Sequence, residues 1–135
     1  ARPLALGNPP QRYRDFFDRA QEVYYGVQEV LVPGNTARDV LKVSQKFLDR
    51  GYSVQCPTIH GWGQRIIPPF ADLPGSKVWT AELDVPFEEN QLIMIEPSPC
   101  SPDTTAGIFV GDLNRVTPGG AETLHQWPFE FTVKD

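Results

Sequence analysis

The fold is decided by the stretch Gln11–Gly51, which reads QRYRDFFDRAQEVYYGVQEVLVPGNTARDVLKVSQKFLDRG. Its first half, up to Leu31, repeats apolar side chains at intervals of three and four residues, which predicts a helix with one buried face. Pro33-Gly34 ends this helix, because proline has no amide hydrogen and glycine favours a turn. A second helix is predicted after Thr36, whose hydroxyl can cap it, and Asp39 three residues later completes an approximate capping box. The closing glycine suits the left-handed position that follows a helix.

The remainder of the chain predicts short strands separated by turns. The chain holds 14 prolines and 11 glycines, which cluster after the predicted helices and break the sequence repeatedly. Between these breaks we predict strands at Val78–Leu83, Gln91–Glu96, Gly107–Val110, Leu113–Thr117, Ala121–Leu124 and Phe129–Val133. Pro118-Gly119-Gly120 predicts a hairpin turn. Two helices followed by a mostly antiparallel sheet define the α+β fold class.

Length and composition narrow the choice of partners and location. A chain of 135 residues with 40% hydrophobic residues fits one domain with a core. The net charge of −5 and the lack of a basic run argue against a nucleic-acid partner. Every apolar stretch is far shorter than the ~20 residues that cross a bilayer. No signal segment opens the sequence, so we expect no membrane partner and a cytoplasmic location.

His60 lies in the segment Thr58–Gly63, which reads TIHGWG. Glycines beside a histidine let a ligand approach the imidazole closely, because they carry no Cβ. A single loop histidine is more often a surface or packing residue, so this motif alone does not define a site.

Glu96 ends the apolar run Leu92–Ile95 and precedes Pro97. A buried carboxylate is costly unless it is paired, protonated or bound to a metal. Glu96 is therefore either a functional group or a side chain that points into solvent where the strand ends. Asp112 follows Gly111, a pair typical of either a bulge or a turn.

The two cysteines lie near these candidates in the sequence. Cys56 precedes His60 by four residues, and Cys100 follows Glu96 by four. A Cys–His nucleophile pair and a His/Glu/Cys metal site are both compatible with this spacing, which is diagnostic of neither. Two cysteines are too few for a disulfide scaffold. His125 has no companion motif and is predicted to lie on the surface.

Four segments, in the same order, resemble motifs of the pita-bread peptidases, the fold of Xaa-Pro aminopeptidases, prolidases, methionine aminopeptidases and creatinase. They are the turn Pro33–Val40, the histidine segment His60–Gly63, the strand Asn90–Pro97 with its glutamate, and the hairpin Gly107–Leu124. The resemblance implies that residues 1–135 form a single domain like the C-terminal part of such a peptidase domain, with the upstream strands absent. The Xaa-Pro peptidase and creatinase branch is the nearest.

The resemblance also implies a site. In active members two Asp, one His and two Glu hold two metal ions, and a bridging water becomes the nucleophile. His60 and Glu96 match the ligand His and the first ligand Glu, which makes them both the metal and the catalytic candidates. The second ligand Glu falls on Gly111, which has no side chain. Asp112 beside it is predicted to point to the opposite face of the strand.

Two other family positions also differ. A second histidine, thought to assist catalysis in the family, falls on Ile67, which cannot transfer a proton. The two ligand Asp residues precede the first long helix in the family, and Ala1–Pro10 contains no acid. At most two of five metal ligands are therefore kept, and two ligands rarely hold a catalytic metal.

These observations favour a degenerate pita-bread module, a pseudoenzyme that binds a peptide, a small molecule or a partner chain. The alternative is a hydrolase of the Xaa-Pro peptidase or creatinase type, active in a longer form or without metal, in which His60 and Glu96 transfer protons. We expect no cofactor, with manganese, cobalt or zinc as the alternative. An exposed sheet edge and apolar face further predict association with a second copy or a partner chain.

Overall fold

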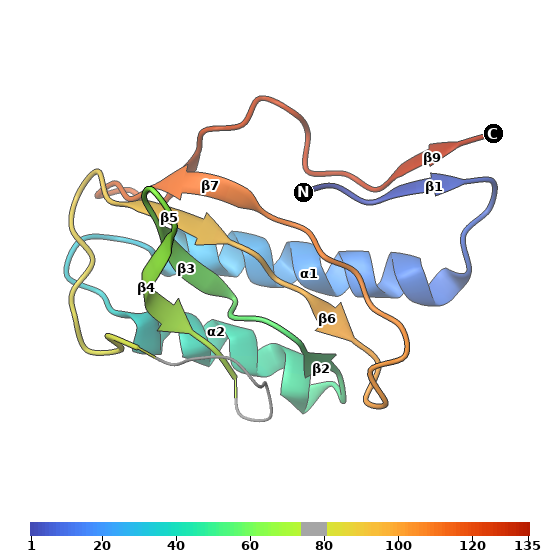
Figure 1. The fold of residues 1–135 in the computed structure, drawn as a ribbon, viewed down its shortest axis with the longest axis horizontal. Helices are drawn as coiled ribbons and strands as arrows, with labels where there is room; N and C mark the ends of the chain where they lie inside the picture. Colours follow the sequence, from blue (N-terminus) through green and yellow to red (C-terminus); the bar gives the residue numbers. More distant parts are fainter. Residues whose placement is uncertain (74–80) are drawn as a thin grey trace.

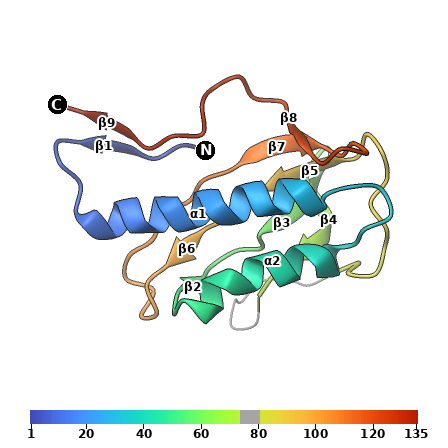
Figure 2. The ribbon, with the colours of Figure 1, turned by 180° about the vertical axis from the view of Figure 1, so that it is seen from behind.

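The computed structural model describes residues 1–73 and 81–135. Two helices, α1 (Gln11–Val30) and α2 (Ala37–Asp49), cover one face of an antiparallel sheet (Figures 1 and 2). The strands of the described residues are β1 Leu4–Leu6, β2 Ser53–Val54, β3 Ile59–Trp62, β4 Ile66–Ala71, β5 Leu92–Ile95, β6 Pro99–Cys100, β7 Asp112–Arg115, β8 Glu122–Thr123 and β9 Thr132–Lys134. The main sheet has the order β4-β3-β5-β7-β8, which confirms the predicted α+β class.

Both helices form where the sequence predicts them. The capping box at the start of α2 is present, because the Thr36 side chain accepts a hydrogen bond from the backbone and the Asp39 carboxylate accepts one from the Thr36 amide. Gly51 has a φ of 77° and ends α2 in the left-handed conformation. Within the described residues, neither helix is long and apolar enough to cross a membrane.

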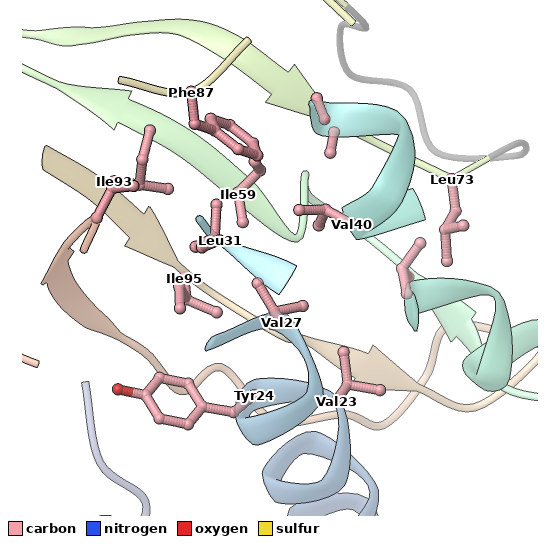
Figure 3. Packing of buried hydrophobic residues seen from close by; sticks show 14 of the residues in the cluster. Val23, Tyr24, Val27, Leu31, Val40, Ile59, Leu73, Phe87, Ile93 and Ile95 are labelled. Carbon is pink, nitrogen blue, oxygen red and sulfur yellow. The ribbon is translucent and has the colours of Figure 1, made fainter. Parts of the chain in front are cut away.

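The register of the central strands sorts their side chains onto two faces. Ile59 pairs with Ile95, and His60 pairs with Met94. Because side chains alternate along a strand, the isoleucines share one face and His60 lies on the other. The isoleucine face carries the core, in which residues of both helices meet the sheet (Figure 3). The members of the core that the figure labels are Val23, Tyr24, Val27, Leu31, Val40, Ile59, Leu73, Phe87, Ile93 and Ile95.

Two strands differ from the predictions because glycine and proline conceal them. β3 contains Gly61 and β4 contains Pro68-Pro69, residues that normally mark turns. Gly61 is needed here because a Cβ would collide with the carbonyl oxygen of Pro68 on the paired strand. The predicted strand Gly107–Val110 is wrong, since this segment makes only an isolated bridge from Gly107 to Cys100.

The other predicted strands correspond to shorter elements. β5, β7 and β8 lie inside Gln91–Glu96, Leu113–Thr117 and Ala121–Leu124, except that β7 begins one residue early, at Asp112. The hairpin turn between β7 and β8 is confirmed, with Gly120 at a φ of 112°. Most of the predicted strand Val78–Leu83 lies outside the described residues.

The first and last described strands lie side by side, away from the main sheet (Figure 1). β1 pairs with β9 in parallel, with Leu4 opposite Thr132 and Leu6 opposite Lys134. This pairing brings the N-terminal residues against the segment that follows β8. A strand was predicted for Phe129–Val133, but its parallel partner at the N-terminus was not.

Arg2 fastens these two ends to the sheet. Its guanidinium donates to both carboxylate oxygens of Asp112, at 2.8 and 2.6 Å. It also donates to the carbonyl oxygens of Trp127 and Pro128, at 2.9 and 2.6 Å, and lies 4.6 Å from the ring centre of Phe129. The Asp112 side chain is only 3% exposed. A bidentate, buried ion pair of this kind fixes orientation as well as distance.

Tyr24 of α1 completes the surroundings of Asp112. Its hydroxyl lies 3.3 Å from Asp112 Oδ2 and 3.3 Å from Asn114 Oδ1. Burial, with a contribution from the charge of Asp112, raises the pKa of Tyr24 to about 12, so the hydroxyl stays a neutral donor. Helix α1, strand β7 and the N-terminal residues therefore share one polar cluster.

We predict that Asp112→Ala will lower the free energy of unfolding by about 3–5 kcal/mol, because Arg2 loses its buried partner. Urea unfolding followed by far-UV circular dichroism measures the change. Asp84→Ala is the matched control, since the Arg38–Asp84 pair is exposed and exposed ion pairs contribute little. Equal effects of the two substitutions would show that the Arg2–Asp112 pair does not hold the ends of the chain.

Candidate functional site

His60 and Glu96 meet on the sheet face opposite the helices. His60 lies in the middle of β3, and Glu96 directly follows β5, where its amide still bonds to the carbonyl oxygen of Thr58. Their side chains approach to 3.2 Å between Nε2 and Oε2. The His60 side chain is 5% exposed and the Glu96 side chain 18%. The two residues predicted for the site thus form one nearly buried pair.

Both ring nitrogens of His60 face oxygen atoms that accept hydrogen bonds. Nδ1 lies 3.0 Å from the carbonyl oxygen of Gly61, and Nε2 faces the Glu96 carboxylate. Burial lowers the pKa of His60, but the bond to Glu96, the bond to Gly61 and the charge of Glu96 together raise it above the ordinary value of 6.5. A carbonyl can only accept, so the arrangement favours an imidazolium that donates on both sides.

The pair opens into a mostly apolar cavity of about 300 Å³. The side chains that line the cavity are Cys56, Pro57, His60, Ile66, Phe70, Glu96 and Phe109. Trp62 lies nearby, with its ring centre 5.9 Å from that of His60. Such a volume is at the small end of ligand pockets, which combine apolar walls with a few polar groups.

Gly111 closes the other side of Glu96. In the β5–β7 register Asp112 pairs with Ile95, which places Gly111 beside Glu96. A Cβ at Gly111 would collide with the carbonyl oxygen of Ile95 and would lie 2.8 Å from Cγ of Glu96. Atoms of Ile95 and Glu96 therefore occupy the space that a side chain at position 111 would need.

The remaining candidates lie apart from this pair or contribute differently. Asp112 points to the helix face, as predicted from strand alternation, where it pairs with Arg2; it is a buried strand residue and not part of a turn. His125 is about half exposed, and its Nδ1 lies 3.8 Å from Oδ1 of Asp112. Ile67 is partly exposed on β4 beside Gly61.

Cys56 shares the cavity with His60, whereas Cys100 does not line it. Burial raises the pKa of the Cys56 thiol, a hydrogen bond with Ser98 opposes this, and the charges of Glu96 and Asp72 raise it further. A thiol with a raised pKa is a poor nucleophile at neutral pH. The raised pKa of the thiol therefore gives no support to a Cys–His nucleophile pair, although both side chains line one cavity.

The described residues do not fit a two-metal centre. Across residues 1–73 and 81–135, no group of three or more His, Cys, Asp or Glu side chains is placed to hold a metal ion. His60 and Glu96 supply two side chains that could coordinate a metal ion, and Gly111 supplies none. Metal centres in proteins normally take three or four protein ligands.

The comparisons with known proteins now identify the family. The sequence profile of Metallopeptidase family M24 matches residues 1–118. The chain therefore belongs to metallopeptidase family M24, and its helices and sheet have the pita-bread fold. No curated protein matches the sequence significantly.

Solved structures of this fold are similar over nearly the whole chain. An X-Pro aminopeptidase from Thermotoga maritima MSB8 superposes with a TM-score of 0.79 at 19% identity, covering 96% of this chain and 36% of the other. An Xaa-Pro dipeptidase from Bacillus anthracis gives 0.79 at 21% identity, with 96% and 35% covered. A prolidase from Pyrococcus furiosus gives 0.71 at 23% identity, with 90% and 35% covered. The chain thus spans about a third of the length of these proteins.

The cavity walls were not predicted from the sequence. Ile66, Phe70 and Phe109 line the cavity, but none was a candidate functional residue. One sequence signal was available, since Ile66 and Phe109 are large apolar residues that lie among turn-forming neighbours. In the structure both are about half exposed. Long-range pairing of β3 with β4 is needed before they can be placed beside His60.

We predict that Gly111→Ala will lower the free energy of unfolding by about 1–3 kcal/mol, because the added methyl group forces the backbone away from Ile95 and Glu96. Thermal or urea unfolding measures the loss. Gly119→Ala is the control, since a Cβ there meets only Thr117 Oγ1 at 3.9 Å. Full stability of Gly111→Ala would show that a side chain at this position can be accommodated.

We also predict that stability depends on the protonation of His60. The native pKa lies above the ordinary value of 6.5, so the contribution is fully present below that pH and is lost as the pH rises through the native pKa. Glu96→Gln should lower the His60 pKa and flatten this pH dependence. Proton NMR titration of the imidazole, together with unfolding at several pH values, tests both. An unchanged His60 pKa in Glu96→Gln would contradict the pairing.

Proposed function

We propose that this chain is a pita-bread module that binds a ligand at the cavity beside His60 and Glu96 and does not act as a metallopeptidase. The observation that carries this proposal is the position of Gly111. The resemblance places the second ligand Glu of active family members there, and the backbone at 111 packs against Glu96 without space for any side chain. Ile67, at the position of the family's second histidine, supports the same conclusion.

The cavity supports the binding half of the proposal. It combines apolar walls with one polar pair, the usual composition of a small-molecule site. Ile66 and Phe109, which line the cavity, and Trp62, whose ring lies near that of His60, are about half exposed and offer contact area to a ligand or a peptide. A partner chain or second copy that covers this edge stays a prediction.

A second function is favoured by one specific observation. The His60–Glu96 pair is close and largely withdrawn from water, which suits a general acid or base. A hydrolase of the Xaa-Pro peptidase or creatinase type that works without metal would use His60 to move a proton, with Glu96 holding the ring and its charge. The neighbouring thiol of Cys56 would take no part.

We predict that purified protein will bind no Mn²⁺, Co²⁺ or Zn²⁺ stoichiometrically and will not hydrolyse Xaa-Pro peptides when these ions are added. Elemental analysis, metal titration and a peptide assay measure this for the wild type and His60→Ala. Stoichiometric binding that His60→Ala abolishes would overturn the proposal. Hydrolysis that persists in EDTA and is lost in His60→Ala would establish the second function instead.

The binding role has its own test. A set of small molecules and short peptides is screened against ¹⁵N-labelled protein, and shifts at Gly61, Trp62, Glu96 and Phe109 report occupancy of the cavity. Binding at these residues is expected from several members of the set. A set that moves none of them would overturn the proposed binding site, whatever the outcome of the metal titration.

A further inference from the structure

The polar end of the cavity offers a hydrogen-bond acceptor. Nδ1 of His60 is held by the Gly61 carbonyl, and Nε2 is held by Oε2 of Glu96. Among residues 1–73 and 81–135, no group donates a hydrogen bond to the second carboxylate oxygen of Glu96, Oε1. Only 18% of the Glu96 side chain is exposed to solvent. A partly buried carboxylate oxygen without a protein donor is satisfied by water or by a ligand that donates.

In the part of the chain that the structure describes, no strong hydrogen-bond donor in the cavity wall is free to bind a ligand, because both ring nitrogens of His60 already face protein oxygens. No Lys or Arg lines it, and the hydroxyl of Ser98, close to Glu96 in sequence, is committed to the Glu96 carbonyl oxygen. The thiol of Cys56 is only a weak donor. A carboxylate or phosphate ligand would therefore meet the charge of Glu96 without a strong donor to hold it.

The remaining walls favour positive charge. The rings of Phe70 and Phe109 form the apolar part, and aromatic faces attract cations electrostatically. A carboxylate beside aromatic rings in a low-dielectric cavity is a suitable receptor for an organic cation.

We infer that the cavity binds a small organic ammonium ion with a compact apolar body. The ammonium group donates to Oε1 of Glu96, and the apolar body lies among Ile66, Phe70 and Phe109. This inference rests on the proposed ligand-binding function and adds the chemical class of the ligand. The volume of about 300 Å³ limits the body to a single ring or a short branched chain.

The test compares three compounds with one ring and different charge: cyclohexylammonium, cyclohexanol and cyclohexanecarboxylate. Each is titrated at neutral pH, where the amine is protonated, into ¹⁵N-labelled protein in EDTA, and amide shifts at Gly61 and Glu96 give the Kd. Cyclohexylammonium should bind at least about tenfold more tightly than cyclohexanol, the gain expected from one charge-assisted hydrogen bond. Cyclohexanecarboxylate should bind more weakly than cyclohexanol.

Two variants locate the effect. Glu96→Gln should remove the preference for the ammonium ion while cyclohexanol still binds, and Glu122→Gln, which changes an exposed carboxylate on β8, should leave the preference unchanged. The comparison within the wild type stands even if Glu96→Gln folds poorly. Equal affinity for cyclohexanol and cyclohexylammonium, tighter carboxylate binding, or an ammonium response that needs added Mn²⁺ would each overturn the ammonium assignment.

The outcomes distinguish the ammonium assignment from the proposed ligand-binding function. Binding of cyclohexanol or of other members of the screened set without a charge preference would leave the ligand-binding role intact and remove only the ammonium assignment. If none of the three compounds and no member of the screened set shifts the amide signals, both the ammonium assignment and the ligand-binding function are overturned.

Discussion

The antiparallel pairing of β3 with β5 is the constraint on which the rest of the structure depends. The register that sets Ile59 opposite Ile95 also sets His60 opposite Met94. One face therefore supplies isoleucines to the helices, while the other collects His60 and Glu96. A shift by one residue would exchange the faces, placing His60 in the apolar core and an isoleucine in the cavity. Burial of the core thus fixes the geometry of the site.

The same sheet explains why glycine occupies position 111. β7 continues the register toward Glu96, and the glycine lets its backbone approach the end of β5 more closely than a side chain would permit. The neighbouring Asp112 faces the helices, where Arg2 and Tyr24 hold it. Replacing the glycine by glutamate would therefore require the strand ends to separate, which the Arg2 contacts at the same strand oppose. The glycine at position 111 and the tight packing of β7 against the end of β5 are two aspects of one local arrangement.

The sequence predicts the helical half of the fold well because its signals are local. The capping residues Thr36 and Asp39, the stop at Pro33-Gly34 and the left-handed Gly51 act within one turn of the chain, and each is found as predicted. The strands are less predictable, because Gly61 in β3 permits close contact with β4, and both it and the prolines of β4 are residues that normally mark turns. The pairing of β1 with β9 joins the two ends of the chain and leaves no local pattern.

For the site, the sequence resemblance indicated His60 and Glu96, and the fold brings them within 3.2 Å. What the resemblance could not supply is the balance of donors and acceptors around them. That balance depends on the Gly61 carbonyl, on Phe70 and Phe109 in the wall, and on the lack of a Lys or Arg side chain among the described wall residues, all of which follow from long-range pairing. The cavity holds a nearly buried carboxylate, that of Glu96. Such a group is stable only with a proton, a cation or a donor nearby. His60 provides one donor, to Oε2, and the chemistry of the cavity is determined by what satisfies Oε1.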